Sequence, residues 1–248
     1  MSAPVFLITG ATGQLAGSVI GLMGGRGDRL LLTGRDKDRL DGLRRRHGVA
    51  GRIETLATDV SDPEGARLAA EEAVRRFGRL DGLVHLVGGF RAGPLFLMDI
   101  GAYEQMLRDN FLSAVTATQA VLPHLSEGAR LVYFSTPLAG EPLPALSAYT
   151  AAKAALVAWV RSIAHEVKRS GIHANTIVMT MADTPDKRRE RPGTNFDHTV
   201  TPELVARVVG FLTCEASDGL YGSCVPVLGR FEFTSELGGP PPGVGGPR

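Results

Sequence analysis

Short apolar stretches alternate along this chain with longer stretches in which apolar and polar residues repeat at helical spacing. Several short stretches are apolar at every position, which is typical of parallel strands covered on both faces. They predict strands at Val5–Thr9, Arg29–Thr33, Arg52–Ala57, Leu80–Leu86, Arg130–Ser135, Ile172–Val178 and Cys224–Leu228. The longer stretches predict helices at Gly13–Met23, Lys37–His47, Pro63–Phe77, Asp99–Leu122, Ala148–Arg169 and Pro202–Cys214.

The alternation of strands and helices predicts one α/β domain. We expect a doubly wound, Rossmann-type domain over residues 1–237, with a mostly or wholly parallel seven-stranded sheet flanked by helices on both faces. Residues 238–248 consist largely of Gly and Pro, and we expect them to form a flexible tail.

Two stretches interrupt the alternation. "GGFRAGPLFLMD" follows the fourth predicted strand, and the polar, basic segment 181–200 follows the sixth. In a doubly wound sheet, ligands bind beyond the carboxyl ends of the strands, where both stretches begin. We therefore predict that both border a binding site and that segment 181–200 forms a lid, the alternative being a solvated surface insertion.

Composition narrows the classes of function. The chain is 44% hydrophobic and carries a net charge of +1, so neither nucleic acid nor an anionic membrane is an expected partner. No apolar run approaches the ~20 residues of a membrane span, and the N-terminus lacks the features of a secretion signal. With two cysteines and no Cys/His cluster at zinc spacing, we expect a cytoplasmic protein without a metal site.

A glycine-containing turn joins the first predicted strand to the first predicted helix. In "VFLITGATGQLAGSVI", Gly10 and Gly13 stand in the turn, and Ala16 faces back toward the strand. Small residues there let the backbone approach a pyrophosphate, which the amides and dipole at the helix N-terminus stabilise. The turn therefore predicts a dinucleotide site, although a plain tight turn would give the same pattern.

The end of the second predicted strand bears on the choice of dinucleotide. NAD-binding proteins usually place an acidic residue there, to bond the ribose hydroxyls. Gly34 holds that place here, Arg35 follows, and Asp36 is expected to cap the next helix. We predict that Arg35 pairs with the 2′-phosphate of NADP(H), with NAD(H) as the second possibility, although an exposed turn arginine would look the same. Against NADP(H), the glycine turn itself has no basic residue, since Gln14 is neutral.

Polar residues with catalytic potential gather at later positions. Tyr149 and Lys153 are four residues apart and share a helix face, where a cation beside a phenol assists proton transfer. Thr136 and Ser135 end the fifth predicted strand, and Asn110 lies inside an apolar helix, where asparagine is disfavoured unless its side chain has a task. Each could alternatively be a structural residue, but their combination beside a nucleotide turn favours a catalytic site.

This combination resembles the short-chain dehydrogenase/reductase family, over nearly the whole chain up to about residue 230. "YTAAKAAL" is similar to the family's Y-x-A-S-K-A-A, "DNFLSAV" to its N-x-x-G helix, and "GIHANTIVMTMADT" to G-I-R-V-N-x-I-x-P-G-x-x-x-T. Two motifs depart from the family pattern. His85-Leu86-Val87 replaces Asn-Asn-Ala before Gly88, and Met179-Thr180 replaces Pro-Gly.

The resemblance implies roles for these residues. Tyr149 is the general acid/base, and Lys153 lowers the pKa of Tyr149 and binds the nicotinamide ribose. Thr136, or alternatively Ser135, orients the substrate oxygen, and Asn110 holds a water of the proton relay. The cofactor-binding residues that we expect are Gly10, Thr12, Gly13, Gln14, Leu15, Arg35, Asp59, Val60, Gly88, Tyr149, Lys153 and Thr184.

The sequence thus predicts an NAD(P)(H)-dependent oxidoreductase that transfers hydride between nicotinamide and a carbonyl or alcohol. A non-catalytic nucleotide-binding sensor or scaffold is the alternative function. "VGGFRAGP" and "TPDKRRERPGTNF" also resemble a branch related to dihydropteridine reductases, which implies a pterin or quinonoid compound as the alternative substrate. We interpret His85 as a packing or turn residue rather than an acid/base group. We also expect a homo-oligomer, a tetramer or dimer, with Val157, Trp159 and Val160 offering apolar surface for its interface.

Overall fold

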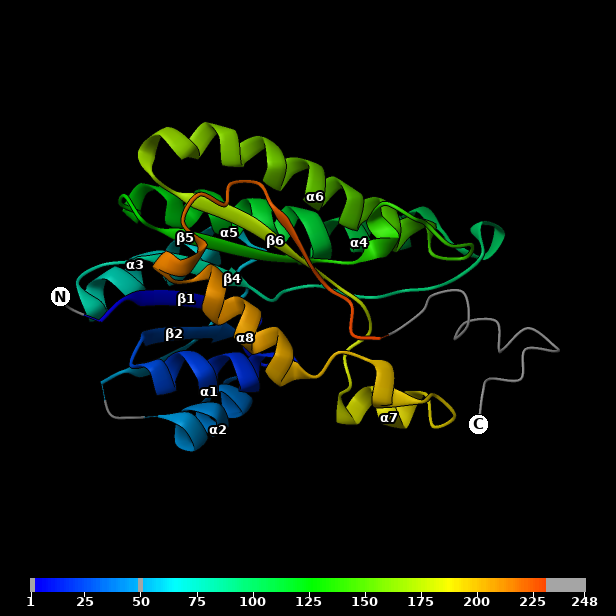
Figure 1. Ribbon diagram of the computed structural model, residues 1–248, viewed down its shortest axis with the longest axis horizontal. Coiled ribbons are helices and arrows are strands. Elements are labelled where there is room, and N and C mark those ends of the chain that lie inside the picture. The colour runs from blue at the N-terminus through cyan, green and yellow to red at the C-terminus, as the bar shows by residue number, and fades with distance from the viewer. Residues whose placement is uncertain (1–2, 49–50, 231–248) are drawn as a thin grey trace.

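In this computed structural model, which describes residues 3–48 and 51–230, seven strands form one parallel sheet in the order β3-β2-β1-β4-β5-β6-β7 (Figure 1). The strands are β1 Val5–Thr9, β2 Arg29–Gly34, β3 Ile53–Ala57, β4 Gly82–His85, β5 Arg130–Ser135, β6 His173–Met179 and β7 Cys224–Val227. The doubly wound α/β domain predicted from the sequence is confirmed. The predicted Gly/Pro tail, 238–248, lies outside the described residues.

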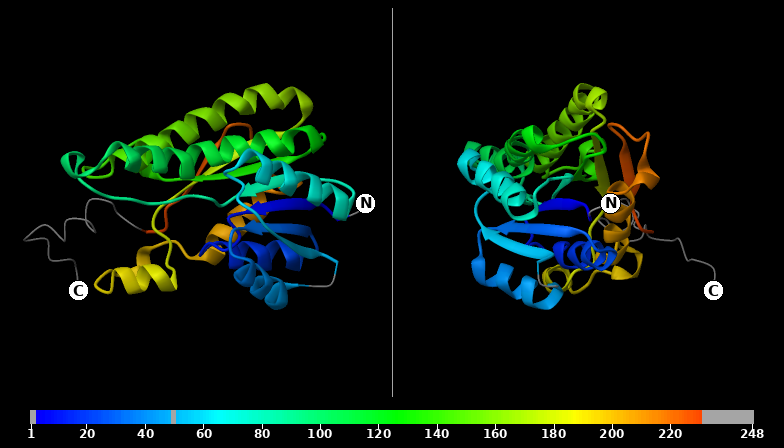
Figure 2. Two further views of the ribbon diagram at one scale, coloured as in Figure 1. Left: turned by 180° about the vertical axis from the view of Figure 1, so that it is seen from behind. Right: turned by 90° about the vertical axis from the view of Figure 1, so that its left-hand side faces the viewer.

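Helices cover both faces of the sheet. They are α1 Ala16–Arg26, α2 Lys37–His47, α3 Pro63–Phe77, α4 Ile100–Leu107, α5 Ser113–Val121, α6 Ser147–Val167, α7 Pro185–Glu190 and α8 Pro202–Leu212. One face carries α3, α5 and α6 and the other carries α1, α2 and α8, while α7 lies beyond the carboxyl edge of the sheet (Figures 1 and 2).

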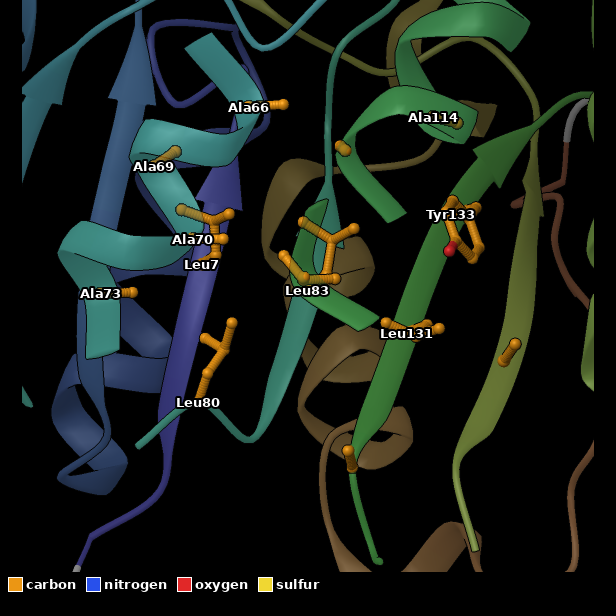
Figure 3. Packing of buried hydrophobic residues seen from close by; sticks show 14 of the residues in the cluster. Leu7, Ala66, Ala69, Ala70, Ala73, Leu80, Leu83, Ala114, Leu131 and Tyr133 are labelled. Atoms are coloured by element: carbon orange, nitrogen blue, oxygen red, sulfur yellow. The ribbon is translucent and has the colours of Figure 1, made fainter. Parts of the chain in front are cut away.

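The strands are buried on both sides because alternate side chains enter different cores. In β1, Val5 and Leu7 pack with α3, α5 and α6, whereas Phe6 and Ile8 pack with α1 and α8. Figure 3 shows the first of these cores, in which a row of alanines on α3 approaches the leucines of the sheet. Small side chains on the helix let it lie close to the strands.

Most predicted helix starts are confirmed by their caps. The Asp36 side chain accepts a hydrogen bond from the Arg39 amide and begins α2, and the Asp62 side chain caps α3 with Pro63 at its first position. The first helix begins at Ala16 rather than at the predicted Gly13, because Gly13 donates its amide hydrogen to the Gly10 carbonyl inside the turn.

Two segments differ from the sequence-based expectation in kind. The predicted helix Asp99–Leu122 is divided into α4 and α5 by a π-helical segment, Arg108–Leu112, which contains Asn110. Segment 181–200, expected without regular structure, contains α7, which Thr184 caps and Pro185 begins. A side-chain cap followed by proline is a helix start signal that the sequence analysis did not use here. The end of α1 lies three residues later than predicted, at Arg26 instead of Met23, and the other boundaries agree or shift by one or two residues.

The apolar surface expected on α6 is mostly used inside the subunit. Val160 is fully buried, and the Trp159 ring packs edge-on against Tyr133 and Phe111, with ring centroids 5.6 and 6.2 Å away. Val157 is partly exposed and, unlike Trp159, does not belong to the aromatic cluster. Val160 is therefore a core residue and the expectation that it contributes to a subunit interface is wrong.

Candidate active site

A pocket of about 500 Å³ opens at the carboxyl edge of the sheet. The ends of β4, β5 and β6 form its floor, and the first turns of α1 and α6, the π-helical segment and α7 form its walls. Many residues predicted from the sequence meet in it: Gln14, Leu15, Gly88, Asn110, Ser135, Thr136, Tyr149, Lys153 and Thr184. The fold thus brings together side chains from distant parts of the chain.

Tyr149 and Lys153 lie one turn apart near the start of α6. The Lys153 Nζ donates a hydrogen bond of 2.9 Å to the Phe134 carbonyl oxygen, which ties α6 to the end of β5. The Tyr149 ring meets the Phe90 ring edge-on, with their centroids 5.0 Å apart. Phe90 belongs to the stretch after β4, so this stretch borders the pocket, as predicted.

Burial controls both ionisable groups. It lowers the pKa of Lys153 to about 8 and raises the pKa of Tyr149 to about 12, because the charged form of each loses hydration. The family resemblance implies that Lys153 lowers the pKa of Tyr149. In the structure burial is the cause that sets the Tyr149 pKa, and the phenol is protonated at neutral pH.

Asn110 holds the segment after β4 in place. Its side-chain Oδ1 accepts a 3.2 Å hydrogen bond from the Gly89 amide, and its Nδ2 donates to the carbonyls of Gly89 and Met106 at 3.0 and 3.1 Å. Both amide hydrogens are therefore used by the protein. A water on Asn110, as the family resemblance implies, would have to contact the remaining lone pair of Oδ1 or the main-chain carbonyl.

The two candidate hydroxyls at the end of β5 differ in their partners. Ser135 Oγ donates to the Lys153 carbonyl at 3.4 Å, whereas Thr136 Oγ1 accepts from the Leu138 amide at 3.4 Å. Both residues are buried and both line the pocket. Because the Thr136 hydroxyl acts as an acceptor in its contact, its proton is free for a ligand oxygen.

His85 has a role that the sequence analysis missed. Its Nδ1 lies 2.8 Å from Thr9 Oγ1 and its Nε2 lies 3.1 Å from Ser113 Oγ, and Ser113 Oγ donates to the Asp109 carbonyl at 2.8 Å. Since the Ser113 proton is used on Asp109, His85 Nε2 donates and Nδ1 accepts from Thr9. Burial, and next the Lys153 charge, lower the pKa of His85 to about 3, so the ring is neutral.

This chain of hydrogen bonds joins β1, β4 and the π-helical segment. The sequence did contain a signal for this role of His85. It is a polar residue at the end of a buried strand, where packing alone would favour an apolar residue. His85 is indeed not placed as an acid/base group, but its contacts are more specific than those of a packing residue.

The glycine turn is tightly packed at Gly10 and leads into an uncapped helix start. Gly10 has a φ of +67°, and a Cβ on it would lie 2.8 Å from backbone atoms of Leu86 and Val87, so no larger residue fits there. Helix α1 begins without a side-chain cap and without an acidic residue in its first turn. The turn therefore fits the pyrophosphate of a dinucleotide.

Other predicted nucleotide-binding residues lie along the same edge, beside the pocket rather than in its lining. The end of β3 adjoins that of β2 through a 2.9 Å bond from the Thr58 amide to the Gly34 carbonyl. Arg35 and Asp59 are exposed, and Val60 is buried. The Asp59 Oδ1 accepts from the Ser61 amide at 2.9 Å. Thr12 is likewise outside the lining, although it belongs to the glycine turn.

Helix α7 covers one side of the pocket and carries mostly paired charges. Lys187 is bonded to Glu190, Arg188 to Asp183, and Arg189 to Asp186. The Asp186 carboxylate also accepts a hydrogen bond from the Gln14 side chain in the glycine turn. The basic residues of this segment are therefore largely neutralised, and its role as a lid is still a prediction.

Comparisons with known proteins identify the family and the fold. The family model described as enoyl-(acyl carrier protein) reductase matches residues 15–229. The 3-oxoacyl-(acyl-carrier-protein) reductase of Thermotoga maritima is 24% identical over 240 residues, which cover 92% of this chain and 98% of that protein. An uncharacterized oxidoreductase of Staphylococcus saprophyticus is 26% identical over 185 residues, covering 73% and 79%.

Solved structures show the same fold. An NADPH-bound short-chain oxidoreductase of Pseudomonas aeruginosa, which contains an atypical catalytic centre, has a TM-score of 0.85, 26% identity and coverage of 93% of this chain and 97% of that one. A short-chain dehydrogenase of Burkholderia cenocepacia in complex with NADP has a TM-score of 0.82, 26% identity and coverage of 91% and 96%. Together with the family match, they show that this chain belongs to the short-chain dehydrogenase/reductase family of oxidoreductases.

Proposed function

We propose that this protein is an NADP(H)-preferring reductase that transfers hydride between nicotinamide and a carbonyl or alcohol, with Tyr149 as the general acid/base. The observation that carries the proposal is the convergence of Tyr149, Lys153 and the hydroxyls of Ser135 and Thr136 on one pocket, directly beside the glycine turn. The proposal therefore rests on a proton donor that lies next to the predicted nucleotide-binding edge of the sheet.

The cofactor, when bound, supplies or accepts the hydride. In this proposal the residues of the chain do the remaining work. The glycine turn and the N-terminus of α1 hold the pyrophosphate, Lys153 binds the nicotinamide ribose, and Thr184 contacts the cofactor from the start of α7. Support for NADP(H) comes from Arg35, from the lack of a carboxylate at Gly34, and from the bound cofactors of two similar structures.

The proton balance favours reduction at neutral pH. A carbonyl that gains hydride on carbon must gain a proton on oxygen, and Tyr149 is protonated because burial raises its pKa to about 12. The Thr136 hydroxyl orients the substrate oxygen toward the phenol. Oxidation of an alcohol needs the opposite transfer, to a phenolate, and therefore becomes easier only as pH rises.

The pocket suits a carbonyl compound with an apolar body. Its walls include Leu86, Val87, Leu138, Leu146 and Met181, and its polar groups come from the predicted catalytic positions, from the glycine turn and from α7. We infer a ketone or an acyl-thioester-linked carbonyl as the substrate class. The position of Phe90 against Tyr149 favours a flat pterin or quinonoid compound as the second candidate, because Phe90 is a half-exposed aromatic side chain beside the phenol and offers the compound a stacking partner.

Two substitutions test the proposal. Tyr149→Phe should lower kcat by at least a hundredfold, the usual effect of losing a general acid, with NADPH affinity close to wild type, because only the proton is lost. Lys153→Ala should lower kcat and also weaken NADPH binding, because Lys153 is assigned a role in each. NADPH oxidation with a panel of carbonyl compounds measures kcat, and NADPH fluorescence measures the dissociation constant. Equal loss of NADPH binding in the two variants would contradict the separate roles.

The same experiment examines a second function. The replacements at residues 85–87 and 179–180 favour a nucleotide-binding sensor or scaffold that keeps the fold. A sensor would bind cofactor and oxidise none of it with any carbonyl, whether or not Tyr149 carries its hydroxyl. Turnover in the wild type that disappears in Tyr149→Phe excludes this function.

A further inference from the structure

The glycine turn has no basic residue of its own, but the structure places one against it. Arg39 Nη2 donates a 2.6 Å hydrogen bond to the carbonyl oxygen of Thr12 in the turn. Thr12 and Gln14 are the polar side chains that the turn itself contributes, and Gln14 is bonded to Asp186 of α7. The positive charge beside the glycine turn therefore comes from Arg39, in the first helical turn of α2.

The fold fixes this contact from both sides. Asp36 caps α2 by accepting a 3.0 Å hydrogen bond from the Arg39 amide, which sets the direction of the first helical turn. The Ala11 amide donates to the Thr33 carbonyl at 2.9 Å and holds the glycine turn beside the end of β2. Gly34 keeps the gap clear, since a Cβ there would lie 3.2 Å from the Thr12 methyl group.

Arg39 keeps hydrogen-bond donors available for an anion. The Asp36 Oδ1 caps α2 by accepting a hydrogen bond from the Arg39 amide, and Gly34 has no carboxylate to bond ribose hydroxyls. Arg35 is exposed at the end of β2 and Arg39 is exposed one turn into α2. A guanidinium has five N–H donors, so Arg39 can hold the Thr12 carbonyl and still bond phosphate oxygens. Lys37 and Asp38 balance each other in charge, and Asp36 and Asp41 are further acidic residues in this stretch.

We propose that Arg39 is a specificity-determining residue that binds the 2′-phosphate of NADP(H) together with Arg35. Helix α2 supplies the positive charge that the glycine turn lacks. This inference rests on the proposed preference for NADP(H), which it explains by a second arginine. Arg39 then contacts the cofactor as well as the glycine turn.

The test uses the full chain and two nucleotide fragments, 2′,5′-ADP and 5′-ADP, which differ by the 2′-phosphate alone. Isothermal titration calorimetry should show that Arg39→Ala weakens 2′,5′-ADP about tenfold or more, as for other charge-assisted pairs, and leaves 5′-ADP within about twofold. Arg35→Ala should have the same selectivity. Arg39→Lys, which keeps the charge and loses the planar fork, should lie between Arg39→Ala and wild type.

Arg45→Ala is the matched control, because Arg45 is an exposed arginine later on the same helix and should change neither affinity. If Arg39→Ala weakens both fragments equally, Arg39 only clamps the turn and the inference is wrong, while Arg35→Ala still tests the cofactor preference. If wild-type protein binds 5′-ADP as tightly as 2′,5′-ADP, the proposed NADP(H) preference itself is wrong. Thermal unfolding of each variant shows that it is folded.

Discussion

Tyr149 and Lys153 have pKa values shifted in opposite directions for the same reason, because burial opposes whichever form is charged. The phenol stays protonated and the ammonium loses its proton more readily. At the scale of single residues, the site is thus tuned mainly by exclusion of water. Hydrogen bonds then decide which polar group remains available to a ligand.

The end of β5 gives the first prediction at this scale. Thr136→Ala should lower kcat tenfold or more, because the hydroxyl that orients the substrate oxygen is lost. Ser135→Ala should have a smaller effect, because the Ser135 hydroxyl already donates to the Lys153 carbonyl. Steady-state kinetics with a common carbonyl substrate ranks the two. A larger loss in Ser135→Ala would identify Ser135 as the active hydroxyl.

His85 gives a prediction about pH. Its pKa in the folded protein, about 3, is below the value of 6.5 for an unperturbed histidine. A depressed pKa contributes stability that is fully present above about pH 6.5 and is lost as pH falls toward 3, because only the unfolded chain takes up the proton. Urea unfolding of wild type should show this loss between pH 6.5 and 3.

His85→Gln is the matching variant, since a glutamine amide can still donate to Ser113 without titrating. Its unfolding free energy should fall less steeply over the same range, while the carboxylates contribute equally to both proteins. Parallel curves for the two proteins would show that His85 does not titrate as the structure implies. His85→Leu, which leaves the Thr9 and Ser113 hydroxyls without their partner, should cost about 1–3 kcal/mol near pH 7.

At the scale of elements, the π-helical segment between α4 and α5 is the feature that positions the site. A π-helical turn inserts an extra residue and changes the direction in which following side chains point. Here it places Asn110 against the segment after β4, where a Cβ on Gly88 would lie 2.9 Å from Asn110 Oδ1. The close fit explains why a glycine is kept at this point.

Asn110→Leu should break all three hydrogen bonds of this side chain. Because the Gly89 amide and two carbonyls lose a buried partner, we expect a loss of about 1–3 kcal/mol in unfolding free energy, together with a lower kcat. Asn110→Asp keeps the acceptor for Gly89 but sets a carboxylate oxygen against the two carbonyls, so it should lose at least as much stability. Chemical denaturation and kinetics on both variants measure the effects. Unchanged stability in Asn110→Leu would contradict the positioning role.

At the scale of the whole molecule, exposed apolar residues lie on the helices that carry the site. Leu107 and Leu112, on the helix with Asn110, are 38% and 48% exposed, and Phe96, after β4, is 84% exposed. No helix in the described ranges is long and apolar enough to span a membrane. We propose that the protein assembles into a dimer or tetramer through the face that contains Leu107 and Leu112.

Light scattering at micromolar concentration should show the assembly in wild type. Leu112→Glu should shift it toward the monomer, because a charge would be buried in the apolar contact. Phe96→Ser is the control for Leu112→Glu. It removes an exposed apolar side chain from the segment after β4 and should leave the assembly intact. A monomeric wild type would refute the proposal, and dissociation by Phe96→Ser alone would place the contact at residues 95–100 instead.

The sequence by itself determined the fold class and much of the candidate site. Periodicity is a local property, so all seven strands and the capped starts of α2 and α3 could be predicted from it. Gly10 and Gly13 could also be recognised, because a tight turn at the first strand–helix junction has few solutions. The convergence of Tyr149, Lys153 and Asn110 followed from parallel strands ending at one edge and from the family resemblance.

Only the tertiary structure decided how these residues act together. The π-helical segment around Asn110 depends on its contacts with Gly89, which lies 21 positions away in the chain. The pKa of Tyr149 depends on burial by several elements, and the contacts of His85 and Arg39 join strands and helices far apart in sequence. Local pattern cannot contain such information, because desolvation and hydrogen bonding depend on which segments the folded chain brings together.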